Sequence, residues 1–179
     1  GGFYTPDAGT IRLGTRALEG EPAWRIARAG VARTYQTSQL FGGMSVLDNL
    51  VVAQTKGRLG LPVVEPIAGA AQRRAIDRAA TLAAFVGYGG DLLRRAADLP
   101  HVDRRLVEIA RALATDPDVL LLDEPAAGLA REDKDRLGRL LQRIAARGIA
   151  VVLVEHDMSL VMGVSDEVAV IDAGAGIAA

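Results

Sequence analysis

Three wholly apolar runs in the last third of the chain constrain its fold more than any other feature. They cover residues 119–122, 149–154 and 168–171, and such an uninterrupted run is expected of a strand that is covered on both faces. Between the first two runs, residues 131–147 carry leucines at helical spacing along one face. Strands that alternate with helices predict a parallel sheet with right-handed crossovers, and therefore an α/β fold.

Helical patterns dominate the middle of the chain, where we predict no strand between residues 37 and 113. Ser45 and Asp48 have the spacing of a capping box, which begins a helix. The stretch 55–69 holds too many glycines and prolines for a regular element. Residues 1–36, in contrast, indicate short strands and turns. The predicted helices run from Ser45 toward Ala53, from 70 to 85 and from 102 to 114.

Polar side chains follow the predicted strands at the point where each strand ends. Asp123 and Glu124 come directly after the first apolar run. His156 follows the second run, and Gln36 ends an earlier candidate strand over residues 30–36. The carboxyl ends of parallel strands form the edge at which such folds bind ligands, where one carboxylate can hold Mg²⁺ and the next can deprotonate a water. Taken singly, each residue also fits a surface turn, a cap or a loop.

A further candidate site is the helix that begins near residue 100. Its start holds Pro100, His101, Val102 and Asp103. Backbone amides at the start of a helix can bind an anion, although an ordinary helix N-terminus explains the same residues.

Composition excludes several classes of site. The chain has no cysteine, and His101 and His156 are its only histidines, so disulfides, thiolate metal sites and His-rich metal sites are excluded. A formal net charge of −1 provides no basic field that would recruit nucleic acid. No apolar run is long enough to cross a bilayer, so we expect any membrane association to be through a partner.

The order of these motifs resembles that of ABC transporter ATPases. Gln36, the segment 99–113, the Asp123–Glu124 pair and His156 correspond to the Q-loop, signature, Walker B and H-loop of that family. In finer detail the chain is similar to the ATP-binding subunits of branched-chain amino acid importers. The matching segments lie within residues 2–9, 30–36, 40–49, 99–113 and 123–129.

This resemblance implies an α/β fold of the P-loop NTPase type. Residues 1–36 and 114–179 would form parts of a RecA-like core with a parallel sheet, and residues 37–113 an inserted α-helical subdomain. The implied activity is ATP hydrolysis coupled to solute transport, with branched-chain amino acid uptake as the expected process.

The resemblance also implies roles for the individual residues. Asp123 and Gln36 would help to bind ATP and its Mg²⁺, with Gln36 acting through water. Glu124 would be the general base for the attacking water, and His156 would contact the γ-phosphate. Positioning and charge neutralisation do most of the work in phosphoryl transfer.

Two kinds of protein partner follow from the resemblance. Subunits of this family close head to tail over two ATP molecules, so Pro100, His101, Val102 and Asp103 would bind the nucleotide of a second ATP-binding subunit, identical or different. The loop from Leu40 to Ser45 would contact transmembrane permease subunits. These partners imply a cytoplasmic position on the inner face of the cell membrane, and nucleic acid is not an expected partner.

Three departures from the family pattern affect these expectations. No Gly-x-x-x-x-Gly-Lys-Ser/Thr motif (Walker A) occurs, and in the family it would lie just upstream of Gly1. We therefore expect the chain to be N-terminally truncated and, by itself, to bind ATP poorly and hydrolyse it negligibly. Pro100, His101 and Val102 replace the usual serine and two glycines of the signature, and Val102 restricts φ. Ala130 stands where the family has aspartate or asparagine.

These departures leave alternatives open. A non-catalytic ABC-like regulatory or scaffold protein would tolerate them, although the presence of Gln36, Glu124 and His156 argues against a loss of the catalytic residues. Lipid-export ABC ATPases share many of the motifs, so the direction of transport stays open. Another P-loop enzyme with an Asp-Glu pair, such as a recombinase-like ATPase, would not be expected to carry the 99–113 segment.

Overall fold

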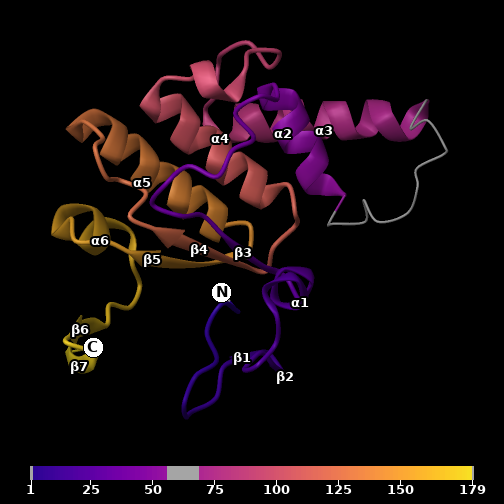
Figure 1. The fold of residues 1–179 in the computed structure, drawn as a ribbon. Helices are drawn as coiled ribbons and strands as arrows, with labels where there is room; N and C mark the ends of the chain where they lie inside the picture. Colours follow the sequence, from indigo (N-terminus) through magenta and orange to yellow (C-terminus); the bar gives the residue numbers. More distant parts are fainter. Residues whose placement is uncertain (1, 56–68, 179) are drawn as a thin grey trace.

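The computed structural model describes residues 2–55 and 69–178, and a parallel sheet lies at its centre (Figure 1). Val31 lies opposite Val119 and Arg33 opposite Leu121, and the next pair of strands also advances in step, so all three strands run in the same direction. This arrangement confirms the predicted α/β fold and brings the carboxyl ends of the strands to one edge. In spatial order the sheet contains β3 (Val31–Arg33), β4 (Val119–Asp123) and β5 (Ala150–Val154).

Helices cover one face of this sheet. Leu120 and Leu122 of β4 are 0% and 1% exposed. They share a core with apolar residues of α4 (His101–Leu113) and α5 (Arg131–Ala145), which lie above the sheet in Figure 1. Burying a leucine side chain stabilises a fold by about 1.5–3 kcal/mol, so this layer fixes the sheet against the helices. The buried side of α5 consists of Leu137, Gly138, Leu140, Leu141 and Ile144.

The opposite face is only partly covered, which corrects the prediction of strands buried on both sides. Val152 and Val154 of β5 are 49% and 58% exposed. In Figure 1 the N-terminal elements lie below the sheet, on the side of β3. An apolar run describes the strand alone, whereas its burial depends on elements elsewhere in the chain. Those N-terminal elements are β1 (Arg12–Leu13), β2 (Arg16–Ala17) and α1 (Ala23–Arg28).

Helix α1 is a second correction, because only strands and turns were predicted for residues 1–36. A helix of six residues is too short to establish a helical periodicity in the sequence. Nowhere in the described ranges is there a helix long and apolar enough to span a membrane.

The residues between β3 and β4 form the predicted helices. The capping box of α2 is confirmed, since Ser45 Oγ accepts from Asp48 N at 3.0 Å and Asp48 Oδ2 accepts from Ser45 N at 3.3 Å. The stretch 55–69 lies outside the described residues, except for its two end positions. In chain order the elements are α2 (Val46–Gln54), α3 (Ala70–Val86), a 3₁₀ turn (Ala96–Asp98) and α4.

The third apolar run does not join the parallel sheet, which is a further correction. After α6 (Met158–Val164), strand β6 (Val170–Asp172) pairs antiparallel with β7 (Ala175–Ala178). Ala173 and Gly174 between them both have positive φ, of 46° and 83°, as in the tight turns that favour hairpins. The local hairpin therefore provides the hydrogen-bond partners of β6, and Ile171 is 70% exposed.

Candidate functional site

The carboxyl edge of the sheet gathers the polar residues that end β3 and β4. Asp123 is the last residue of β4, and its Oδ2 lies 2.9 Å from Arg33 Nη2 of β3. These side chains are 33% and 35% exposed, so the ion pair contributes at most about 1 kcal/mol to stability. Its main effect is to orient the Asp123 carboxylate.

Glu124 occupies a turn that two neighbouring segments hold in place. Its φ is +44°, a left-handed conformation that is uncommon for residues other than glycine. Its backbone N donates to Val154 O at 2.9 Å, which fixes the turn to β5. Its Oε2 accepts a hydrogen bond from Gln36 Nε2 at 2.9 Å. The structure thus brings together two predicted site residues that are far apart in the sequence, and backbone strain of this kind is frequent at functional sites.

His156 lies just beyond the end of β5, in a loop that its neighbours define. Glu155 Oε1 accepts from Ala126 N at 2.7 Å, and Asp157 caps α6. Two hydrogen bonds lower the pKa of the Asp157 carboxyl. The larger effect comes from Lys134, at 2.7 Å, and the next largest from the Leu160 backbone amide. The His156 imidazole itself is exposed, and it has no hydrogen-bond partner within residues 2–55 and 69–178.

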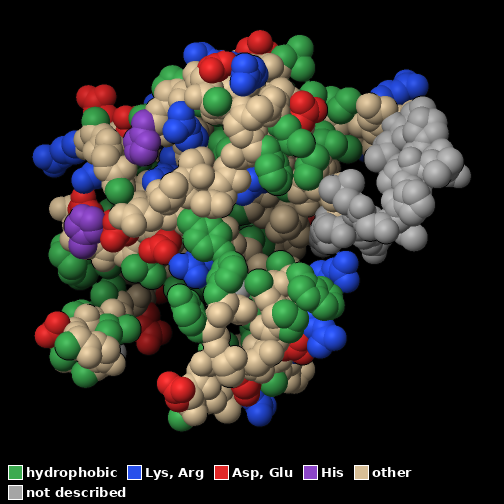
Figure 2. Space-filling view, in the orientation of Figure 1, with side chains coloured by type: hydrophobic (Ala, Val, Ile, Leu, Met, Phe, Trp, Pro, Cys, Tyr) green, Lys and Arg blue, Asp and Glu red, His purple; other side chains and the backbone are tan. Residues whose placement is uncertain are grey.

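The start of α4 lies against the loop that follows Glu124. His101 Nε2 is 3.0 Å from Ala127 O, and a Cβ added at Gly128 would lie 3.3 Å from the same nitrogen. Pro100 is the N-cap residue, and Asp103 places a carboxylate in the first turn of the helix. That negative charge weakens the attraction of the helix start for an anion. Both histidines of the chain are visible on one face in Figure 2.

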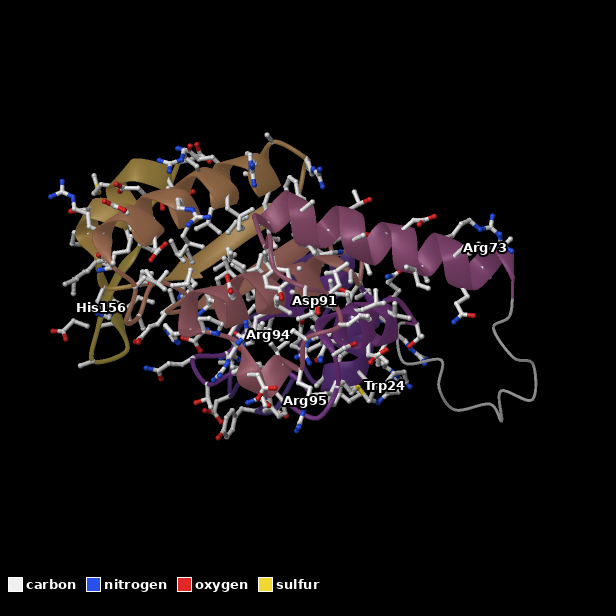
Figure 3. All side chains as sticks on the ribbon, turned by 90° about the horizontal axis from the view of Figure 1, so that it is seen from above. Trp24, Arg73, Asp91, Arg94, Arg95 and His156 are labelled. Carbon is white, nitrogen blue, oxygen red and sulfur yellow. The ribbon has the colours of Figure 1, made fainter. Side chains whose placement is uncertain are left out.

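The loop of residues 40–45 is exposed but fixed at both ends. Asn49 is completely buried, and its side chain bonds Phe41 N, Phe41 O and Ser45 O. Phe41 and Met44 are 50% and 40% exposed. A backbone hydrogen bond from Ala96 N to Met44 O, at 2.9 Å, also holds the loop. Arg94 and Arg95, which directly precede Ala96 and are labelled in Figure 3, are exposed.

Sequence reasoning missed Arg33, Arg105 and Glu108 as parts of this region. Arg105 Nη1 donates to Tyr35 O at 3.2 Å and forms a buried pair with Glu108 of the same helix. The signal for the pair was an arginine and a glutamate three positions apart on the apolar side of α4. No local pattern in the sequence connects Arg105 with the segment after β3.

The arrangement has the groups needed for chemistry on a phosphate. Asp123 presents a partly exposed carboxylate, and Glu124 presents another that accepts one hydrogen bond from an amide. Ionised carboxylates are acceptors only, so they can hold a hard cation or take a proton from water.

Comparison with known proteins identifies related sequences and structures. A family model described as ABC transporter matches residues 1–127. The chain is 42% identical to the high-affinity branched-chain amino acid transport ATP-binding protein LivG of Escherichia coli strain K12, over 99% of this chain and 71% of LivG. It is 40% identical to BraF of Pseudomonas aeruginosa, with the same coverage. The ADP conformation of an ATP-binding cassette of an ABC transporter has a TM-score of 0.82 at 27% identity, over 99% of this chain and 70% of that one.

Proposed function

The chain belongs to the ABC transporter family, and from that premise we propose that it is part of the ATP-hydrolysing subunit of an importer for branched-chain amino acids. The relatives LivG and BraF, which are named for high-affinity transport of these solutes, support the solute class. The observation that carries the proposal is the 2.9 Å hydrogen bond from Gln36 Nε2 to Glu124 Oε2. It joins the segments that follow two neighbouring strands, β3 and β4, at the edge where α/β sheets bind ligands.

Glu124 is the general base in this proposal. The Gln36 amide occupies one acceptor position of its carboxylate and so sets the direction of the group. The remaining lone pairs can take a proton from a water that attacks the terminal phosphate. Val154 holds the backbone of this turn, which keeps the carboxylate in place during the reaction.

Asp123 and Gln36 offer oxygen atoms of the type that Mg²⁺ prefers. Mg²⁺ is often bound by one or two carboxylates together with substrate phosphates and water. The described ranges hold no cluster of three His, Cys, Asp or Glu side chains, so these residues fit the ion only in that shared form. When bound, the ion would neutralise charge on the phosphate oxygens. Arg33 holds one oxygen of Asp123, which aims the carboxylate for this role.

His156 and the start of α4 complete the proposed nucleotide contacts. The exposed His156 imidazole would donate to the γ-phosphate from the end of β5. Pro100, His101, Val102 and Asp103 would face the nucleotide of a second ATP-binding subunit. Because Asp103 opposes an anion there, binding at this point depends on the backbone amides and on His101.

The loop of residues 40–45 is the proposed contact with permease subunits. Phe41 and Met44 expose apolar surface, and the nearby Leu93 is 70% exposed. Apolar side chains on a rigid, exposed loop are typical of a protein interface. The fixed position of the loop supports this role, because a preorganised surface loses little entropy on binding.

The same proposal extends to the domain division and to the place of the protein in the cell. Residues 1–36 and 114–179 would belong to the nucleotide-binding core, and residues 37–113 to the helical subdomain. The helices between β3 and β4, which lie above the sheet in Figure 1, support this division. Contact with a permease would place the subunit on the cytoplasmic face of the membrane.

Substitution of Glu124 by glutamine in the intact protein, assembled with its permease, tests the proposed base. Glutamine keeps the shape but cannot accept the proton, so we expect ATP binding to persist and turnover to fall by a factor of about 10²–10⁴. Glu132→Gln is the matched control, because Glu132 is an exposed carboxylate in the first turn of α5. Undiminished hydrolysis by Glu124→Gln would refute the assignment.

The solute class needs a separate measurement. Vesicles that contain the assembled transporter should take up leucine, isoleucine and valine in an ATP-dependent way. Lipid export from the same vesicles, without amino acid uptake, would replace the proposed direction and solute. ATP-independent behaviour of the whole assembly would favour a regulatory or scaffold role.

A further inference from the structure

A buried charge pair lies between α4 and the segment that follows β3. Arg105 and Glu108 are 4% and 6% exposed, and Arg105 Nη1 is 2.9 Å from Glu108 Oε2. A well-packed apolar pair often stabilises a fold more than two buried charges do. In the described part of the chain, Arg105 Nε and Glu108 Oε1 also lack hydrogen-bond partners. Stability of α4 alone therefore does not explain the presence of this pair.

The Arg105 guanidinium also holds the backbone that leads to Gln36. Thr34 N still donates to Leu121 O of β4 at 2.9 Å, so the sheet fixes the chain up to that residue. Beyond it, Tyr35 O accepts from Arg105 Nη1 at 3.2 Å and Gln36 O accepts from Nη2 at 3.4 Å. Figure 1 shows this segment running alongside α4. Gln36 thus takes its backbone position from α4 rather than from the sheet.

We propose that Arg105 is a positioning residue for ATP hydrolysis, which fixes the Gln36 backbone so that the Gln36 amide reaches Glu124. Glu108 holds the guanidinium in the required orientation. The inference rests on the proposed function, since it requires Glu124 to act on the attacking water. Arginine suits this role because its planar fork donates in several fixed directions, whereas lysine presents a single point charge.

Arg105→Lys in the intact protein is the direct test. Lysine keeps a positive charge beside Glu108 but cannot hold both carbonyl groups, so Gln36 loses its fixed position. A displacement of about 1 Å near reacting groups costs up to about 100-fold in rate, so we expect kcat to fall by about 10- to 100-fold. KM for ATP should change little, because the lost interaction acts in the transition state.

The matched control is Arg143→Lys. Arg143 also donates from a helix to a backbone carbonyl, that of Phe85, but it lies outside the proposed site. This variant should keep the wild-type kcat. An equal loss of kcat in both variants would mean that the effect comes from general loosening of the fold, and the positioning role would be wrong.

A double-mutant cycle with Gln36→Ala separates positioning from packing. If Arg105 acts through Gln36, Arg105→Lys causes no further loss of kcat once the Gln36 side chain is removed. Fully additive losses would overturn the inference, as would an unchanged kcat in Arg105→Lys alone. Because the wild-type rate is measured in the same series, absence of hydrolysis by the wild type would instead refute the proposed function itself.

A second variant keeps the test informative if Arg105→Lys fails to fold. Arg105→Gln combined with Glu108→Gln removes both charges, so neither is left buried and unpaired. We expect a folded protein with the same loss of kcat, again without effect in the Gln36→Ala background. A wild-type kcat in this variant would overturn the positioning role.

Discussion

Replacing Asn49 with leucine tests how the loop of residues 40–45 is held. Asn49 is 0% exposed. Its Oδ1 accepts from Phe41 N at 2.9 Å, and its Nδ2 donates to Phe41 O at 3.1 Å and to Ser45 O at 2.9 Å. Leucine has the same branched arrangement of heavy atoms but is bulkier and has no polar atom, so the substitution removes these bonds without creating a cavity.

The expected loss of stability follows from these contacts. A typical intramolecular hydrogen bond contributes about 1 kcal/mol net, so the set contributes about 3 kcal/mol. Phe41 is 50% exposed, so water can replace part of what its backbone loses. The buried leucine also contributes apolar burial. We therefore expect a net destabilisation of about 2 kcal/mol.

Urea denaturation of the free subunit measures this value, and the m-value should stay unchanged. Gln54→Leu is the matched control: on the same helix, Gln54 Nε2 donates to Ala75 O at 2.9 Å, away from the loop. It should cost about 1 kcal/mol or less. Stimulation of ATP hydrolysis by the permease should fall in Asn49→Leu and persist in Gln54→Leu. An Asn49→Leu protein as stable as the wild type would refute the reasoning.

Two further predictions concern the loop after Glu124 and the start of α6. Gly128 has a φ of +74°, and a Cβ at this position would lie 3.3 Å from the His101 side chain. Gly128→Ala should therefore lower stability by about 1 kcal/mol or more, measured by thermal melts. An unchanged melting temperature would contradict this prediction. The folded-state pKa of Asp157 lies below its unfolded value, chiefly because of the hydrogen bond from Lys134. The contribution of Asp157 to stability is therefore present above the unfolded pKa, and it disappears as pH falls through the folded pKa. Lys134→Met should therefore reduce stability in urea at neutral pH, and this reduction should shrink as the pH is lowered and Asp157 takes up its proton. A reduction that is the same at neutral and acid pH would contradict the assignment.

Local patterns in the sequence predicted the features that depend on neighbouring residues. The capping box of Ser45 and Asp48 lies within one helical turn, and it begins α2 as expected. Strand β4 and its terminal Asp123 were predictable because a short apolar run that ends in polar residues is typical of a buried strand in an α/β fold. The parallel sheet followed from the alternation of strands and helices.

Features that depend on distant partners were not predictable in this way. The 168–171 run had the composition of a buried strand, but a turn at Ala173 and Gly174 lets it pair with β7 instead. The hydrogen bonds from Arg105 to the carbonyl groups of the segment after β3 join residues about 70 positions apart. Backbone carbonyls are the same in every sequence, so no residue pattern identifies them as acceptors.

Two features that lower stability lie along one chain of hydrogen bonds between α4 and the end of β4. The left-handed backbone at Glu124 and the buried pair of Arg105 and Glu108 each lower stability relative to simpler alternatives. Gln36 lies between them and contacts both, through its carbonyl on one side and its amide on the other. Since the buried Arg105 guanidinium donates to the Gln36 carbonyl, a displacement of α4 changes the position of the Gln36 amide against Glu124. In our proposal Glu124 is the general base, and its carboxylate then depends on the placement of the helix that begins with residues 100–103 and faces the second subunit.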